Sequence, residues 1–247
     1  MDRVARERAF YNAKADTYRM LRRLIWRAIG EFNRNHEVHR LEDPVGKAVL
    51  LYGCGPGYGA REMLAKGAAT VTGIDISDAE IAEAKRKATA GGYADKVDLR
   101  VADAHNTGFP DDSFDLIVGS AIIHHLDLGL ALEELRRILR PSGRAVFREP
   151  LLDNPFLRLG RRLTPGARTP DEHPLTVADW ELCASVFPGF RHYEVECLVI
   201  PLMPLNLFLP RRWQKRWAAG LSAWDDRMLE RFPALRRFAR TTFLVLE

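Results

Sequence analysis

The stretch KAVLLYGCGPGYGA, residues 47–60, places a run of apolar residues directly before four closely spaced glycines. A buried parallel strand that ends in a glycine turn typically delivers the chain to a ligand. Counted from Gly55, the pattern is G-x-G-x-x-A, which fits a dinucleotide fingerprint. Counted from Gly53, it is G-x-G-x-G, which suits a nucleoside cofactor that lacks a phosphate. This stretch alone leaves both cofactor classes open.

Strand and helix patterns alternate after this turn. Ser77 and Glu80 form a capping box at the start of one helix, Gly67 and Gly91 end helices, and Pro141 is expected to end a third. Such alternation favours a parallel sheet covered on both faces. We therefore predict an α/β fold with a doubly wound, mostly parallel sheet over residues 44–150. The expected strands are 47–52, 69–75, 97–103, 113–121 and 143–150, and the expected helices are near 58–66, 78–90 and 128–140.

The flanking segments complete a single domain, residues 1–247. Residues 3–33 have the apolar spacing of one or two helices and form an N-terminal cap over residues 1–40. Residues 151–247 form a substrate-side segment, in which Thr176 and Asp179 are expected to cap a helix through about Val186. Strands are expected at 190–200 and 241–247. Between them lies a helical insertion, about residues 204–239, rich in Trp and Arg.

Composition is that of a soluble globular protein, with 47% apolar and 28% charged residues. The three cysteines, Cys54, Cys183 and Cys197, have no metal-ligand spacing, so we expect neither a disulfide framework nor a zinc site. Charges in the first ten residues argue against a signal peptide. The longest apolar stretch, Cys197 to Pro210, is too short and too rich in proline to span a bilayer. These features predict a cytoplasmic location.

The formal charge of +4 is unevenly distributed. Residues 1–40 carry ten Lys/Arg against five Asp/Glu, and residues 205–240 carry nine against three. Either these are solvated faces of amphipathic helices, or they form a basic rim around a pocket for an anionic or lipid-like substrate. No nucleic-acid-binding motif accompanies the charge, so we expect no nucleic-acid partner. The oligomeric state is left open.

Polar residues follow the ends of successive strands, where open α/β sheets bind ligands. Asp75 ends the second strand and can accept hydrogen bonds from ribose hydroxyls, which both cofactor classes possess. Asp103 follows the third strand and can accept from an adenine amine, while the N–H of Ala104 can reach a ring nitrogen. The fourth strand ends in GSAIIHHL, which includes Ser120.

With these features in their order, the chain resembles the class I S-adenosylmethionine-dependent methyltransferases. The resemblance covers residues 44–150, through LLYGCGPG, TGIDIS, ADAHNTGFPDDSFDLIVGSAIIHHL and LRRILRPSGRAVFREP. It implies S-adenosylmethionine as the cofactor, with Asp75 on the ribose and Asp103 and Ala104 on the adenine. The residues that it implies for the rest of the cofactor site are Gly53, Cys54, Gly55, Gly57, Ile76 and Ser120.

Two positions depart from the family pattern. An acidic residue commonly stands two places before the first glycine, and here that residue is Leu51. Any contact that such a carboxylate makes with the amine of the cofactor must come from elsewhere or be missing. The turn usually written PGG is PSG here, residues 141–143, which we expect to matter little.

Candidate catalytic residues lie close to where the methyl group should point. His124 and His125 follow the fourth strand, and a histidine that titrates near neutral pH suits a general base. Glu149 ends the fifth strand; it either faces the cleft or forms a salt bridge to Arg148 or to one of the arginines that follow. His173, in RTPDEHPL, belongs either to a substrate lid or to a solvated turn. One of the two adjacent histidines could instead pack or cap the next helix. The segment HHLD hints at a metal, but no further ligand has clear spacing, so we predict none.

Two further segments complete the predicted site. Tyr11, in FYNAKADTY, either closes over the cofactor, as in related methyltransferases, or packs in the core. In the insertion, Trp213, Trp217 and Trp224 stand beside arginines. That pattern suits a lid over an apolar substrate, which we favour, weak peripheral membrane contact, or plain structural packing.

The prediction is therefore a methyltransferase that acts on an oxygen or nitrogen of a small metabolite or lipid-like acceptor. Three other functions stay open. A dehydrogenase would need a Y-x-x-x-K pair, and no tyrosine has a lysine four residues on. A cofactor-dependent cyclase or other non-methylating enzyme could use the same fold, as could a cofactor-binding regulatory protein.

Overall fold

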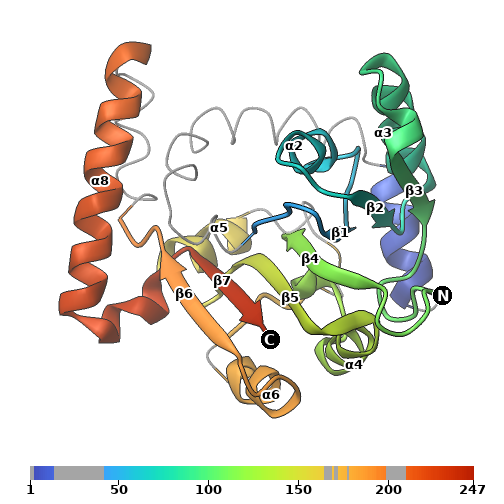
Figure 1. Ribbon diagram of the computed structural model, residues 1–247. Helices are drawn as coiled ribbons and strands as arrows, with labels where there is room; N and C mark the ends of the chain where they lie inside the picture. The colour runs from blue at the N-terminus through green and yellow to red at the C-terminus, as the bar shows by residue number, and fades with distance from the viewer. Residues whose placement is uncertain (1–2, 14–41, 164–168, 170–171, 177, 199–209) are drawn as a thin grey trace.

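A seven-stranded sheet with the order β3-β2-β1-β4-β5-β7-β6 runs through the protein in the computed structural model (Figure 1). The structure describes residues 3–13, 42–163, 169, 172–176, 178–198 and 210–247. The strands are β1 (Ala48–Tyr52), β2 (Thr70–Asp75), β3 (Val97–Val101), β4 (Phe114–Ser120), β5 (Leu139–Pro150), β6 (Arg191–Val195) and β7 (Thr241–Leu246).

The first five strands pair in parallel, and β7 pairs antiparallel with both β5 and β6. The predicted doubly wound, mostly parallel sheet is confirmed. The chain runs outward from β1 to β3 and then returns to β4 on the other side of β1. This reversal puts a topological switch point at the carboxyl ends of β1 and β4, where open sheets of this type bind ligands.

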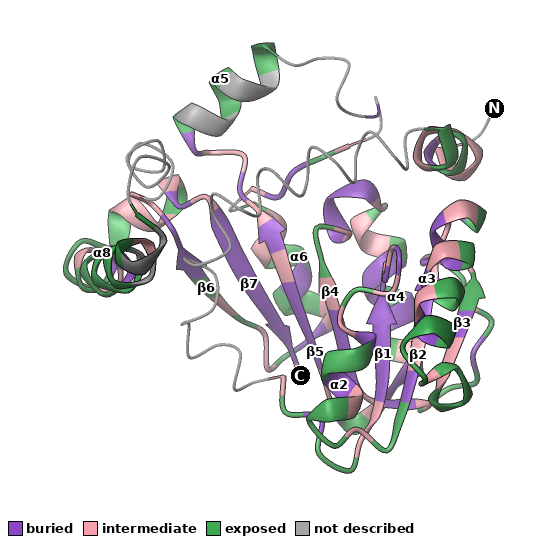
Figure 2. Cartoon of the chain, turned by 90° about the horizontal axis from the view of Figure 1, so that it is seen from above, coloured by how far each residue is buried: buried purple, intermediate pink, exposed green. Residues whose placement is uncertain are grey.

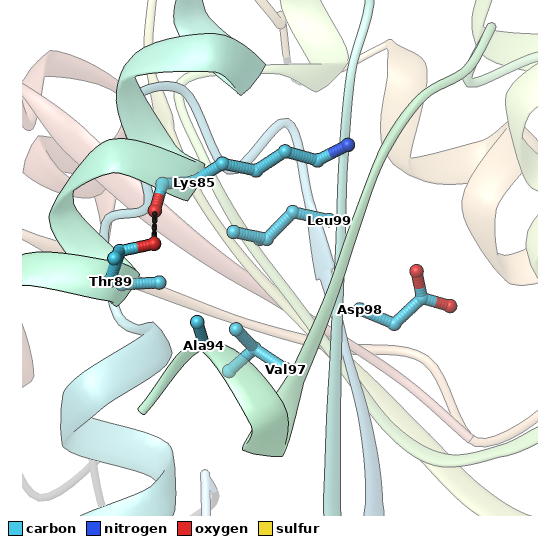
Figure 3. Close-up of a pocket in the computed structure, with 7 residues that line it drawn as sticks. Lys85, Thr89, Ala94, Val97, Asp98 and Leu99 are labelled. Atoms are coloured by element: carbon cyan, nitrogen blue, oxygen red, sulfur yellow. Dashed lines mark hydrogen bonds between the residues drawn. The ribbon is translucent and has the colours of Figure 1, made fainter. Parts of the chain in front are cut away.

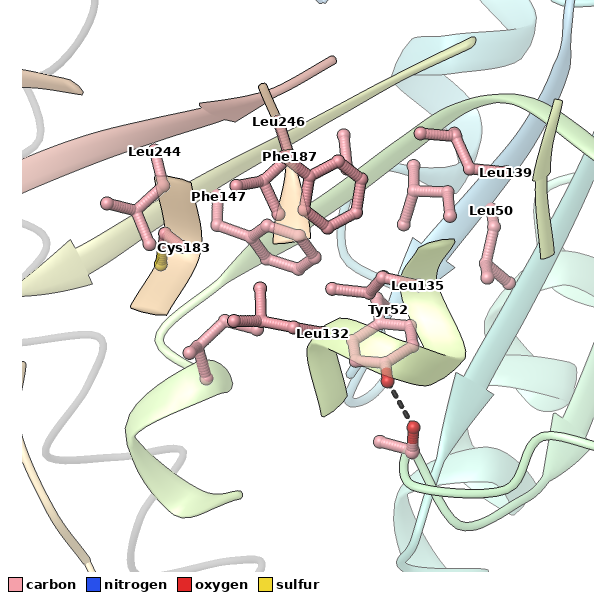
Figure 4. Close-up of a cluster of buried hydrophobic side chains, with 14 of the residues drawn as sticks. Leu50, Tyr52, Leu132, Leu135, Leu139, Phe147, Cys183, Phe187, Leu244 and Leu246 are labelled. Atoms are coloured by element: carbon pink, nitrogen blue, oxygen red, sulfur yellow. Dashed lines mark hydrogen bonds between the residues drawn. The ribbon is translucent and has the colours of Figure 1, made fainter. Parts of the chain in front are cut away.

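Alternation along β1 divides the core into two layers, one on each face of the sheet. Leu50 and Tyr52 join the cluster that contains residues of α4 (Leu128–Ile138) and α6 (Asp179–Val186), part of which is drawn in Figure 4. Val49 and Leu51 join the cluster with residues of α2 (Ala60–Ala65) and α3 (Asp78–Ala90). The central strands β1, β4, β5 and β7 are mostly buried between these layers, whereas the edge strand β3 is partly exposed, as Figure 2 shows.

Helix boundaries follow the predicted caps with one correction. The hydroxyl of Ser77 accepts a hydrogen bond from the Glu80 N–H at the start of α3, as the capping box predicts. The third helix was predicted to continue to residue 140, but α4 ends at Ile138. Leu139 is extended and buried because it pairs with Phe114 in the sheet, so Pro141 lies inside β5 and does not end the helix.

The substrate-side segment departs further from the prediction. At the start of α6 the carboxylate of Asp179 accepts hydrogen bonds from the N–H and hydroxyl of Thr176, at 2.7 and 3.0 Å. The strand predicted at 190–200 is shorter, since β6 ends at Val195. Helix α5 (Pro155–Leu163) precedes it, and the insertion contains α8 (Arg211–Arg231) and the 3-10 helix η5 (Pro233–Phe238).

A helix over residues 3–13 lies beside α3, whereas α8 lies at the other end of the sheet, next to β6 (Figures 1 and 2). The rest of the predicted N-terminal cap, residues 14–40, and the start of the insertion, residues 204–209, fall outside the described residues. In the described part of the chain, every helix is too short or too polar to cross a membrane.

Candidate functional site

The glycine turn after β1 adopts backbone conformations that favour glycine. Gly53, Gly55 and Gly57 have φ values of 73°, 49° and 83°, in the left-handed region. A Cβ on Gly53 would lie 2.8 Å from the side chain of Ile122, which follows β4. The glycines therefore let the backbone pass close to the carboxyl end of β4, as the predicted cofactor site requires. Cys54 lies buried within this turn.

The Asp75 carboxylate spans the carboxyl ends of β1 and β2. Its Oδ2 accepts a hydrogen bond from the N–H of Gly55 at 2.8 Å, and its Oδ1 accepts from the N–H of Ser77 at 3.0 Å. Two backbone donors thus fix the carboxylate at the mouth of the glycine turn. A carboxylate accepts hydrogen bonds, which is the chemistry that the predicted ribose contact needs.

The loop predicted to bind adenine is tied down by a residue that the sequence reasoning missed, His105. Its N–H and Nδ1 lie 2.9 and 2.8 Å from Oδ1 of Asp103, and its Nε2 lies 2.9 Å from the N–H of Asp127. Since Nε2 accepts from a backbone donor, the Nδ1 atom carries the proton. His105 therefore links the Asp103 loop to the start of α4. No sequence motif predicts this contact.

The residue after Asp103 is held from the other side. The carbonyl of Ala104 accepts a hydrogen bond from the hydroxyl of Tyr52, drawn in Figure 4. Burial raises the pKa of the Tyr52 hydroxyl, with the charges of Glu134 and Asp103 acting in the same direction. Tyr52 therefore stays protonated and donates. This fixes the peptide group that follows Ala104, next to the one whose N–H is predicted to meet the adenine ring.

A buried histidine–carboxylate pair lies at the carboxyl ends of β4 and β5. Nδ1 of His124 is 2.6 Å from Oε2 of Glu149, and both side chains are buried. The other oxygen, Oε1 of Glu149, accepts from the N–H groups of Ile122 and Ile123 at 2.9 and 3.1 Å. With its Nδ1 bound to a carboxylate, His124 keeps Nε2 as its basic nitrogen.

Glu149 does not make the ion pair with Arg148 that was its alternative prediction. Arg148 instead lies 3.7 Å from Oε2 of Glu196. Adjacent residues of a strand point to opposite faces of the sheet, so the side chains of Glu149 and Arg148 separate there. Ser120, the last residue of β4, pairs with Arg148 in the sheet and has an exposed side chain.

His125 meets the N-terminal helix. Its Nε2 is 2.9 Å from the hydroxyl of Tyr11, whose ring lies edge-on at 5.5 Å between centroids. Its Nδ1 is 3.6 Å from Oε2 of Glu7. Tyr11 therefore contacts a candidate catalytic residue. Its predicted contact with the cofactor stays a prediction.

The same helix also reaches α3 and the end of β2. Oδ1 of Asn12 accepts from the Ser77 hydroxyl at 2.6 Å and lies 3.3 Å from the N–H of Ala79. Nε of Arg8 donates to the carbonyl of Ile76 at 3.2 Å. One helix thus bridges the predicted ribose edge and the histidine pair.

The segment around His173 covers the histidines through its backbone. The N–H of His173 donates to the carbonyl of His124 at 2.7 Å, while the side chain of His173 is exposed. The neighbouring Glu172 lies close to both histidines. One ligand atom from each of His124, His125 and Glu172 lies within 4.8 Å of the other two. This group could hold a metal ion, although no spacing in the sequence indicated Glu172.

A separate cavity of about 330 Å³ lies between α3 and β3 (Figure 3). Lys85 and Thr89 line it from the helix, and Val97, Asp98 and Leu99 line it from the start of β3. The start of a parallel strand is the opposite edge of the sheet from the glycine turn. This cavity is therefore not part of the predicted cofactor site.

The central part of the chain is similar to known methyltransferases. Residues 50–147 match the family model described as a methyltransferase domain. Methyltransferase GfsG of Streptomyces halstedii is 35% identical over 116 residues, which are 47% of this chain and 42% of that protein. The ubiquinone/menaquinone biosynthesis C-methyltransferase UbiE of Geotalea daltonii is 30% identical over 142 residues, 56% of this chain and 60% of that protein.

Solved structures share the fold well beyond this central part. Geranyl diphosphate C-methyltransferase from Streptomyces coelicolor, in complex with Mg²⁺, geranyl diphosphate and S-adenosyl-L-homocysteine, superposes with a TM-score of 0.60 at 14% identity. The match covers 85% of this chain and 76% of that one. The two curated relatives, by contrast, are matched over only about half of their length.

Proposed function

Because the core of this chain belongs to the class I S-adenosylmethionine-dependent methyltransferases, we propose that the chain methylates an oxygen or nitrogen of a small metabolite or lipid-like acceptor. The observation that carries this proposal is the buried pair of His124 and Glu149 at the edge of the sheet beside the glycine turn. It supplies a basic nitrogen where an acceptor would lose its proton.

The residues at this edge fit the cofactor. A Cβ on Gly53 would lie 2.8 Å from the side chain of Ile122, so glycine brings the turn close to β4, and two backbone amides hold the Asp75 carboxylate at the mouth of that turn. We assign Gly53, Cys54, Gly55 and Gly57 to the methionine part and Asp75 with Ile76 to the ribose. Asp103 and Ala104 then recognise the adenine, and Ser120 lies at the edge of this site. Leu51 is buried in the core, so the amine of the cofactor must find another acceptor.

S-adenosylmethionine supplies an electrophilic methyl group on a sulfonium. The protein has to align the acceptor, exclude water and remove a proton. In the proposed mechanism Nε2 of His124 takes the proton of the acceptor, and Glu149 stabilises the imidazolium through Nδ1–H. Oε1 of Glu149 stays bound to two backbone amides, which holds the carboxylate in place during the transfer. His125 and Tyr11 would line the acceptor side.

Methylation of a carbon is the second candidate. It is favoured by the names of two similar proteins, the relative from Geotalea daltonii and the structure from Streptomyces coelicolor, which are both C-methyltransferases. His124 would then take a proton from carbon, during or after methyl transfer. Product analysis by mass spectrometry and NMR separates transfer to carbon from transfer to oxygen or nitrogen.

Calorimetric titration with S-adenosylmethionine and S-adenosylhomocysteine is the first test. We expect saturable binding of both, and no binding at millimolar concentration would refute the proposal. Incubation with a panel of hydroxylated and amine metabolites should then release S-adenosylhomocysteine with some of them. A product formed without that release would indicate a cyclase, and binding with no product from a broad panel would indicate a regulatory protein.

A further inference from the structure

Three tryptophans share one side of α8 and are exposed. The side chains of Trp213, Trp217 and Trp224 have 49%, 38% and 56% of their surface accessible. Because an α-helix turns by about 100° per residue, these positions lie within about 40° of one another around the axis. Large aromatic side chains are seldom left in water together without a function.

The fold does not need this side of the helix, because another side of α8 anchors it. Leu221 and Leu229 are buried, and α8 packs against β6 and η5. The buried carboxylate of Asp225 accepts from the N–H groups of Cys197 and Leu198, at 2.8 and 2.9 Å, just beyond β6. The tryptophan side is therefore available for another contact.

Positive charge accompanies the tryptophans. The guanidinium of Arg216 lies over the ring of Trp213, 5.5 Å from its centroid. Arg227 and Arg231 are exposed and, by helical spacing, lie on the same side. Together these six residues form what we call the Trp-Arg face: Trp213, Arg216, Trp217, Trp224, Arg227 and Arg231. Residues 205–240 carry nine basic and three acidic residues, a net charge of +6.

We propose that the Trp-Arg face binds the surface of an anionic lipid bilayer, with α8 lying along the interface. Tryptophan side chains favour the headgroup region, where the ring is buried and its N–H stays hydrated. Arginines beside them are attracted to anionic headgroups. An interfacial helix needs an aromatic or apolar side flanked by basic residues, and this face has that composition.

Charge argues against a second copy of the chain on this face, and packing argues against a lid. A second copy of the chain would bring the arginines of one Trp-Arg face against those of the other, which repel. A lid, the interpretation favoured from the sequence, needs its apolar side chains over the acceptor. Instead, the side of α8 that packs against β6 is the one with Leu221 and Leu229, and the tryptophans point elsewhere.

A buried ion cluster lies between the segment that α8 binds and the strand β5. Glu196, after β6, pairs with Arg240 and with Arg148, and its Oε2 accepts from the Thr241 hydroxyl at 2.8 Å. Arg148 precedes Glu149 in β5. Because Asp225 of α8 binds the N–H groups of residues 197 and 198, directly after Glu196, these contacts link α8 to the strand that carries the proposed catalytic carboxylate. Docking of α8 would then orient the acceptor side relative to the bilayer.

Co-sedimentation with vesicles tests the proposal on the full-length protein. The probes are vesicles of phosphatidylcholine alone and of phosphatidylcholine with phosphatidylglycerol at a ratio of about 7:3. We expect pelleting with the anionic vesicles, weakening as salt rises because exposed charges are screened. The triple variants are W213A/W217A/W224A and R216Q/R227Q/R231Q. Each arginine near an anionic surface contributes roughly fivefold to partitioning, so the arginine variant should lose on the order of 100-fold.

Matched controls remove the same number of groups elsewhere. The variant K66Q/K85Q/K96Q deletes three exposed positive charges from the end of α2, from α3 and from the turn before β3, and V45A/L130A/L182A trims three exposed apolar side chains. Both should bind vesicles as the wild type does. Equal loss in a control and its test variant would overturn the proposal, because binding would then follow total charge or apolar surface.

Other outcomes overturn it directly. Pelleting that does not depend on phosphatidylglycerol would do so, as would a dimer by light scattering that the tryptophan variant abolishes. So would a tryptophan variant that still pellets but no longer methylates, which would mean a lid.

If circular dichroism shows that the tryptophan variant does not fold, a second measurement decides. Brominated lipids in anionic vesicles should quench the tryptophan fluorescence of the wild type, and no quenching would overturn the proposal. Apart from the methylation assay, these measurements do not need cofactor binding, so their result is independent of the proposed function.

Discussion

Nδ1 of His124 and Oε2 of Glu149 lie 2.6 Å apart, in a hydrogen bond that joins the carboxyl ends of two neighbouring strands. The rest of the Glu149 carboxylate is held by the backbone of residues 122 and 123. The carboxylate therefore fixes both the orientation of the imidazole and the position of its proton. Only Nε2 is left to exchange a proton with an acceptor.

Glu149→Gln should lower turnover by about 100-fold, the lower end of what general base catalysis contributes. The amide oxygen of Gln can still accept from the two backbone donors, but its NH₂ group cannot stabilise an imidazolium. The dissociation constant of S-adenosylmethionine should change by less than about threefold. Such a change corresponds to less free energy than the loss of one typical hydrogen bond. Rates of S-adenosylhomocysteine release and calorimetric titration measure the two effects.

The matched control is Glu133→Gln, which changes an exposed glutamate on α4. It should leave both turnover and affinity unchanged. Parallel loss of turnover and cofactor affinity in the Glu149 variant, together with a lower melting temperature, would mean that Glu149 is structural.

The sheet and its ligand edge were predictable because they depend on local patterns. Apolar runs that end in Gly53, Asp75 and Asp103 mark the carboxyl ends of parallel strands, and these ends meet at one edge whatever the details. His124 and Glu149 were expected at that edge for the same reason. Their direct contact was not, because it depends on the register in which Ser120 pairs with Arg148.

Contacts between segments far apart in the sequence could not be predicted from the sequence. Tyr11 meets His125 across 114 residues, and this depends on how a short helix docks onto the finished sheet. His105 was overlooked because its partners, Asp103 and the backbone of Asp127, form no motif. The early end of α4 reflects tertiary pairing of Leu139, which overrides helix propensity.

Asp75→Ala should weaken binding of S-adenosylmethionine by about 1–3 kcal/mol, because it removes the acceptor of the ribose hydroxyls and leaves them unpaired. The N–H groups of Gly55 and Ser77 also lose their partner, so the glycine turn itself should loosen. Calorimetric titration measures the affinity, and hydrogen exchange of residues 53–57 measures the loosening. Asp95→Ala, at an exposed position, is the control. Unchanged affinity in the Asp75 variant would remove Asp75 from the ribose site.

Chelation should leave activity intact, whereas added Zn²⁺ should inhibit it. His124 and His125 each use one ring nitrogen in a hydrogen bond, to Glu149 and Tyr11, so the proposed base needs no metal. Yet His124, His125 and Glu172 bring ligand atoms within 4.8 Å of one another, and Zn²⁺ binds such groups readily. Added acceptor should relieve the inhibition. In Glu172→Gln the inhibition constant for Zn²⁺ should rise at least about tenfold, given the usual cost of losing one metal ligand. Activity that disappears with chelation and returns with metal would contradict the base mechanism.

Glu196→Gln should destabilise the protein at neutral pH by about 3 kcal/mol, because Arg240 and Arg148 would be left without their carboxylate. Burial alone would raise the pKa of Glu196, but the two arginines and the Thr241 hydroxyl outweigh it and hold that pKa below its ordinary value of 4.5. A carboxylate whose pKa is lowered by folding stabilises the folded state fully above the ordinary pKa, and this contribution is lost as the pH falls through the lowered one. The difference in free energy of unfolding between wild type and variant should therefore be constant from pH 7 down to about 5 and shrink below about 4.5. Urea denaturation across this range measures it, with Glu83→Gln, which removes a surface ion pair with Arg86, as the control. A difference that stays constant down to pH 3 would show that the charge of Glu196 does not contribute to the free energy of unfolding.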